Sequence, residues 1–101
     1  MAQVTLKPRA IRDLKEISNY VAKNRSREQA RNVLNKIAAT IQANANYPLM
    51  GRSRNELFEG LRSFNVLSYI VFYFPIEDGI DVVRIIYSGR DLGSIDFDEI
   101  T

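Results

Sequence analysis

The sequence contains no cysteine and no histidine among its 101 residues. These two absences exclude disulfide bonds, thiol nucleophiles, imidazole metal ligands and the one side chain that normally titrates near neutral pH. No apolar run approaches the roughly 18 residues that a membrane-spanning helix needs, and the first residues lack the pattern of a signal peptide. We therefore expect a cytoplasmic protein that uses no metal and no cofactor and does not contact a membrane.

The length and composition of the chain indicate one small domain, which we expect to span residues 1–101. The chain is 46% apolar and 26% charged, with a net charge of only +2. The charges are divided unevenly, because residues 1–54 hold 11 basic and 3 acidic residues whereas residues 55–101 hold 3 and 9. This asymmetry is typical of solvated helix surfaces, or of a basic face directed at an acidic partner such as nucleic acid.

The first part of the chain predicts a short strand and a helix. Val4 and Leu6 alternate with polar neighbours, and Pro8 suits the first turn of a helix. Apolar residues then recur at helical spacing, namely Ala10, Leu14, Ile17 and Val21. We expect Asp13 on the opposite, solvated side, with ion pairs from Arg9 to Asp13 and from Arg12 to Glu16.

A second helix is predicted from Ser26 to about Ala45. Ser26 and Gln29 have the spacing of a capping box, and apolar residues follow at helical spacing for four turns. Pro48 ends this helix, because the residue before a proline avoids the helical conformation. The short polar turn between the two helices predicts an antiparallel helical hairpin.

After Gly60 the pattern changes to that of strands. One strand is expected around residues 61–66, a central one at 69–74 and a returning one at 80–87, with Asp78-Gly79 in the turn. Residues 49–60 are interpreted as loop and residues 93–101 as a loose tail. The prediction is an α+β domain of order β-α-α-β-β-β, in which a helical hairpin packs on an antiparallel sheet.

Several short motifs in this order resemble the ParE-type toxins of the RelE/ParE superfamily. They are the helix segment Ala10–Ile17, the stretch Tyr47–Arg52, the strand segment Glu59–Phe64, the run Ile70–Tyr73, and Val83–Ile86 followed by Arg90-Asp91-Leu92. The resemblance extends from about Leu6 to Leu92. It departs from the family where many members have His-Gly, since this sequence has Tyr87-Ser88 there.

The resemblance implies the toxin of a type II toxin–antitoxin system, of the kind that serves plasmid stabilisation, and it leaves two targets open. ParE-type members inhibit DNA gyrase, whereas RelE-type members cleave messenger RNA on the ribosome, and the fold alone does not separate them. For the ribonuclease, the resemblance places Arg62 and Arg90 at the phosphate, and Tyr87 and Asp91 remain as proton-transfer candidates. Arginine stays protonated and cannot act as the base. Because the tail beyond Asp91 offers no further basic or aromatic catalytic residue, we favour the gyrase inhibitor.

The same resemblance implies a cognate antitoxin as partner. A sheet with helices on one face leaves an apolar groove on the other, which an antitoxin segment would fill. For gyrase, the candidate target-binding residues are Arg52, Arg54, Arg62 and Arg90, together with the segment Asp91–Thr101. A structural alternative pairs Arg62 with Glu59 or Asp91, and Arg90 with Asp91.

Two further alternatives stay open from the sequence. The toxin could have decayed into an antitoxin-binding or regulatory module. The basic half could also bind nucleic acid directly, although its lysines and arginines lack the interleaved aromatic residues of a base-stacking platform.

Overall fold

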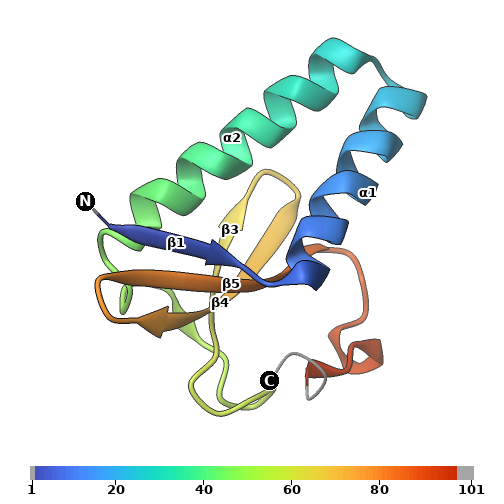
Figure 1. Ribbon diagram of the computed structural model, residues 1–101. Coiled ribbons are helices and arrows are strands. Elements are labelled where there is room, and N and C mark those ends of the chain that lie inside the picture. Colours follow the sequence, from blue (N-terminus) through green and yellow to red (C-terminus); the bar gives the residue numbers. More distant parts are fainter. Residues whose placement is uncertain (1, 98–101) are drawn as a thin grey trace.

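The computed structural model describes residues 2–97 of the chain. Two helices, α1 (Pro8–Asn24) and α2 (Arg27–Ala45), form a hairpin that covers one face of a five-stranded sheet (Figure 1). The strands are β1 (Gln3–Leu6), β2 (Arg52–Ser53), β3 (Arg62–Val66), β4 (Tyr69–Ile76) and β5 (Gly79–Tyr87), and a single 3-10 turn, η1, follows at Leu92–Ser94. The α+β class and the packing of a helical hairpin on a sheet are therefore confirmed.

The sheet is mixed, which corrects the fully antiparallel prediction. Its order is β1-β5-β4-β3-β2, and β3, β4 and β5 form the expected antiparallel meander. β1 runs parallel to β5, because the intervening helices and strands supply the long connection that parallel neighbours need. β2 was expected as loop, but its two residues pair with β3 and form one edge of the sheet.

The turn before β5 also differs from the prediction. Asp78 alone takes the left-handed conformation, with φ of 61°, and Gly79 already belongs to β5 and pairs with Gln3. A Cβ on Gly79 would collide with the backbone carbonyl of Gln3. Glycine is therefore required at this position because it lets β1 approach β5.

Both helices begin where the sequence predicts. Pro8 occupies the first helical position of α1. Ser26 caps α2, since its Oγ accepts a hydrogen bond from the Gln29 backbone N–H at 3.0 Å. Of the two predicted ion pairs on α1, Arg9 contacts Asp13 at 3.2 Å, whereas Glu16 pairs with Arg9 at 3.4 Å instead of Arg12.

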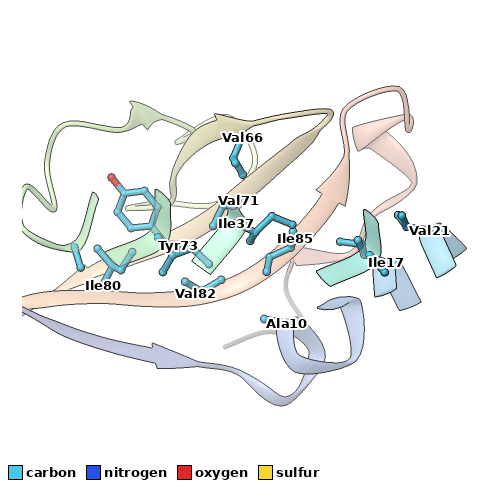
Figure 2. Close-up of a cluster of buried hydrophobic side chains, with 13 residues drawn as sticks. Ala10, Ile17, Val21, Ile37, Val66, Val71, Tyr73, Ile80, Val82 and Ile85 are labelled. Carbon is cyan, nitrogen blue, oxygen red and sulfur yellow. The ribbon is translucent and has the colours of Figure 1, made fainter. Parts of the chain in front are cut away.

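Each face of the sheet has its own buried cluster. Between helices and sheet, Ala10 and Ile17 of α1 and Ile37 of α2 pack on Val71, Tyr73 and Ile85, among others (Figure 2). The opposite face buries apolar side chains that come mostly from β4, β5 and the carboxy-terminal segment: Leu61, Ile70, Phe72, Val83, Ile86, Ile95 and Phe97. Leu57, Phe58, Phe74 and Leu92 pack against this second cluster.

The expectation of an open apolar face was therefore wrong. The chain covers that face itself, with the loop after β2 on one part and residues 92–97 on another. The rings of Phe72 and Phe97 lie 5.0 Å apart and nearly edge to face. Ile95 and Phe97 of the expected loose tail are thus packed on the sheet, and residues 98–101 lie outside the described residues.

Asp13 is buried, which contradicts its predicted place in solvent. Its carboxylate accepts bonds from Arg84 at 2.8 and 3.2 Å and from the Ile85 backbone N–H at 2.9 Å. Ile85 lies beyond Val82, the last residue of β5 that pairs with β1. Asp13 therefore supplies the hydrogen-bond acceptor that β1 would provide if it were longer, and it fixes α1 against the edge of β5.

Candidate functional site

A groove of about 1320 Å³ lies where the helical hairpin extends past the end of the sheet. Its walls come from α1, α2, the turn between β3 and β4, and the end of β5 with the residues that follow. Figure 1 shows that the tip of the β3–β4 hairpin reaches up beside the two helices. Asp13, which lines the groove, is bonded to Arg84 of β5, so this buried pair connects the α1 wall of the groove to the sheet.

Exposed apolar side chains line this groove. Tyr20 is 67% exposed, Leu67 60% and Tyr87 59%, so each has more than half of its surface in water. The Tyr69 and Tyr87 rings meet edge to face with 6.4 Å between centroids. Burial raises the pKa of Tyr69 above its usual 10.0, and the neighbouring Tyr20 and Tyr87 raise it further. This surface suits an apolar partner segment.

Leu67 adopts an unusual backbone conformation at the mouth of the groove. It has φ of 53° in the two-residue turn between β3 and β4, a region that leucine rarely enters. Asn or Gly would suit this turn better. A leucine that is mostly exposed and in an unfavourable backbone conformation is costly to the fold, which favours a role in binding.

Charged groups of both signs surround the apolar floor. Asp13 and Glu16 lie on α1, Arg25 and Lys36 come from the turn between the helices and from α2, and Arg90 follows β5. A partner that fills the groove would therefore need an apolar stripe flanked by mixed charges, which is the pattern of an amphipathic helix.

The four candidate ribonuclease residues do not share one place. Arg62 pairs with Tyr73 of β4, whereas Tyr87 pairs with Tyr69 of the same strand. Tyr69 and Tyr73 are four residues apart along β4, which corresponds to about 13 Å. Arg90 is exposed at the groove, and the Asp91 carboxylate accepts the Gly93 N–H at 2.9 Å, which caps η1.

Arg62 makes structural contacts that the sequence did not predict. Its Nη1 donates to the backbone carbonyls of Leu49 at 3.0 Å and Gly51 at 2.7 Å, so the side chain secures the segment after α2. Within residues 2–97, no ion pair joins Arg62 to Glu59 or Asp91, or Arg90 to Asp91. The alternative of structural ion pairs at these positions was wrong.

The two arginines of the basic loop differ in availability. Arg52 is exposed at the edge strand β2. The Arg54 side chain is only 12% exposed, since it donates to Ser63 Oγ at 2.8 Å, lies 3.7 Å from Glu56 and sits over the Phe72 ring. Arg52 is thus the cation of this loop that a partner can reach, and Arg54 holds the loop on the sheet.

The described part of the chain shows no sign of a metal site or a membrane span. Among residues 2–97, no three acidic side chains come close enough together to bind a metal ion. Neither α1 nor α2 has the length and apolar character needed to cross a bilayer.

Sequence reasoning missed Asp13, Tyr20, Leu67 and Arg84. A signal for Asp13 was present, because it is three residues after Ala10 and four before Ile17 and so falls on the apolar face of α1. Arg84 likewise interrupts an apolar strand. A charged residue within the apolar pattern of a helix and another of opposite sign within that of a strand could have indicated a buried ion pair. Nothing in the local sequence indicates the groove.

Comparison with known proteins identifies the family. The model of the family described as the ParE toxin of the type II toxin–antitoxin system parDE matches residues 4–92. A search of curated proteins gives no match. A solved structure described as the chromosomal ParDE TA system from P. aeruginosa superposes with a TM-score of 0.73 at 17% identity, covering 86% of this chain and 96% of that chain. At this identity the structural likeness shows the fold, and the family match covers both helices and all of the five strands except Gln3, so this chain belongs to the ParE toxin family of type II toxin–antitoxin systems.

Proposed function

We propose that the chain inhibits DNA gyrase in the cytoplasm and is neutralised by a cognate antitoxin. The observation that carries the choice of gyrase over the ribosome is the separation of the ribonuclease candidates. Arg62 is engaged with backbone carbonyls at one level of the sheet, and Tyr87 and Arg90 lie at the other. General acid–base cleavage of RNA needs these groups around a single phosphate. Membership of the ParE family supports the same choice.

The antitoxin is proposed to place an amphipathic helix in the groove. Tyr20, Leu67 and Tyr87 offer the apolar contacts, and the charges around them fix the register of the helix. The structural relative from P. aeruginosa is described as a chromosomal ParDE TA system, which supports a protein partner for this chain as well.

The experiment compares the two candidate activities with one preparation of toxin. Purified toxin is added to gyrase in a plasmid supercoiling assay, and in parallel to a translating ribosome system with a defined message. We expect loss of supercoiling, restored by the antitoxin encoded beside the toxin gene, and no toxin-dependent cuts in the message. The ribonuclease alternative predicts ribosome-dependent cuts that Arg90→Ala abolishes.

Arg90→Ala is the informative variant, because its exposed side chain makes no ion pair within the described residues. Arg62→Ala would release the Leu49 and Gly51 carbonyls and so confuse a catalytic effect with a structural one. Supercoiling that continues at micromolar excess of toxin over gyrase would reject the proposal.

A further inference from the structure

The segment Tyr47–Met50 after α2, here called the apolar loop, exposes three large side chains. Tyr47 is 64% exposed, Leu49 69% and Met50 67%. Turns usually carry glycine, asparagine, aspartate or serine at such positions. None of the three belongs to either buried cluster or to the groove. These side chains therefore contribute little to the packing of the chain itself.

The backbone of the apolar loop is nevertheless held firmly. The Tyr73 hydroxyl donates to the Pro48 carbonyl at 2.7 Å and accepts from the Gly51 N–H at 3.1 Å. Arg62 adds its two bonds to the Leu49 and Gly51 carbonyls. The Met50 N–H also donates to the Tyr47 carbonyl at 3.0 Å. Six backbone polar groups of residues 47–51 are thus satisfied, and two of the anchoring bonds come from a wholly buried side chain.

Glycine is required at position 51 for this arrangement. A Cβ there would overlap the Tyr73 hydroxyl, and it would stand 2.9 Å from the Ser63 carbonyl. Figure 2 shows Tyr73 in the helix-side cluster with its hydroxyl directed away from the labelled apolar side chains. The sequence thus combines a buried tyrosine, an arginine and a glycine to fix a loop whose own side chains point into water. Fixing a loop before binding lowers the entropy lost on association.

The charge around the apolar loop indicates what kind of surface it fits. Residues 44–55 contain two arginines and no acidic residue. Arg52 is exposed, so a partner meets a positive charge directly beside Leu49 and Met50. A protruding apolar loop needs a concave apolar pocket, and this charge favours a pocket with an acidic rim.

The apolar loop and the groove lie at different levels of the sheet. Tyr73, which holds the loop, is four residues along β4 from Tyr69, which lines the groove. This spacing corresponds to about 13 Å along the strand. Substitutions in one surface therefore leave the other intact, which makes the two separable by experiment.

We propose that the apolar loop anchors the toxin on gyrase, with Leu49 and Met50 inserted in an apolar pocket that has an acidic rim. This inference rests on the proposed function, because it takes gyrase as the partner. It adds a contact surface that is distinct from the groove assigned to the antitoxin. In this role Arg62 positions the loop, and Arg52 pairs with the acidic rim.

The test compares the double variant Leu49→Ser/Met50→Ser with Leu67→Ser. Leu67 is a matched control, because it is an exposed leucine in the groove with a similar exposed fraction. Three quantities are measured for each toxin: affinity for the purified gyrase tetramer, growth arrest on expression without antitoxin, and affinity for the antitoxin. Circular dichroism and thermal melting establish that each variant is folded, and Met50→Ser alone serves as a milder second variant.

We expect the double variant to lose about tenfold or more in gyrase affinity, as for two central contacts of an interface, and to keep its antitoxin affinity. Leu67→Ser should keep its gyrase affinity and lose antitoxin affinity. Unchanged gyrase affinity and growth arrest in the double variant would overturn the inference. So would a change from dimer to monomer in the double variant that accounts for its loss of activity, because the loop would then join two copies of the chain.

Failure of the proposed function gives a different result. If wild-type toxin arrests growth but neither binds nor inhibits gyrase, gyrase is the wrong target. The loop is then judged on growth arrest alone, which the double variant would lose if the loop contacts another target and would keep if it does not. A wild-type chain that causes no arrest would overturn both proposals.

Discussion

Asp13 of α1 and Arg84 of β5 are 71 positions apart in the chain and form a two-point ion pair, with contacts of 2.8 and 3.2 Å. Both residues are buried, at 3% and 7% exposure. The carboxylate also accepts the Ile85 N–H, and it contacts Arg9 at 3.2 Å. One side chain thereby connects the helical hairpin to the sheet just past the end of β1.

Asp13→Asn should destabilise the fold strongly, because it leaves the Arg84 guanidinium buried without a counter-charge. Breaking one side of a buried pair costs about 3–5 kcal/mol. Domains of this size are stable by only about 5–15 kcal/mol, so a fraction of the variant would be unfolded at 37 °C. Urea unfolding followed by circular dichroism measures the loss. Glu16→Gln, in a neighbouring exposed pair, is the control and should change stability by less than about 1 kcal/mol. An equally small loss of stability in Asp13→Asn would show that the Asp13–Arg84 pair does not hold the helical hairpin on the sheet.

Tyr73→Phe tests whether the apolar loop is fixed by the sheet. The change removes only the hydroxyl, and with it the bonds to the Pro48 carbonyl and the Gly51 N–H. An unsatisfied buried polar group costs about 1–3 kcal/mol. We expect a loss of stability in this range and faster proteolytic cleavage within residues 47–52. Tyr20→Phe, which alters an exposed hydroxyl, should leave both measurements unchanged. Equal cleavage rates for the two variants would contradict the prediction.

Leu67→Asn should raise stability and weaken antitoxin binding together. Leucine at φ of 53° is strained, and asparagine enters this conformation more readily. Relief of about 1 kcal/mol is expected in urea unfolding. Antitoxin affinity, measured by titration calorimetry, should fall because an exposed apolar contact of the groove is lost. An increase in stability without a change in affinity would separate Leu67 from the binding surface.

Stability should fall at alkaline pH through Tyr69 and Tyr73. Burial is the main cause that raises the pKa of both hydroxyls above 10.0 in the folded chain, although the Gly51 hydrogen bond and Arg62 partly offset it for Tyr73. The unfolded chain therefore loses these protons first, and the contribution to stability is complete below about pH 10 and declines as pH rises further. The urea midpoint should drop between pH 9 and pH 11, and by less in Tyr69→Phe. An equal drop of the urea midpoint in the wild type and in Tyr69→Phe would show that Tyr69 does not contribute to the pH dependence.

The parts of the fold that the sequence predicts are those determined by local pattern. Helix starts follow from Pro8 and Ser26, and the meander follows from alternating apolar runs and short turns. These features depend on neighbours within a few positions, so periodicity and capping rules reach them. The parallel pairing of β1 with β5 depends on residues more than seventy positions apart, and no local pattern encodes it.

The candidate site is predicted less well for the same reason. The sequence directs attention to Arg62 and Arg90 through a family resemblance, yet Arg62 turns out to secure a loop. Its two acceptors are backbone carbonyls, which every residue has and which therefore leave no trace in the sequence. The groove is formed by the relative lengths of the hairpin and the sheet, and it becomes visible only when both are placed in space.

The pairing of β1 with β5 also has a consequence for the order of synthesis. Among the described residues, the first strand pairs in the sheet with β5 alone, and Asp13 bonds to Arg84 and Ile85 of that same strand. A growing chain therefore carries its first strand unpaired, and Asp13 without these two contacts, until residues 79–85 have emerged from the ribosome. The nascent toxin acquires its groove and its anchored loop only when most of it has been made. An antitoxin already present in the cell thus meets the toxin at the moment when both surfaces first form.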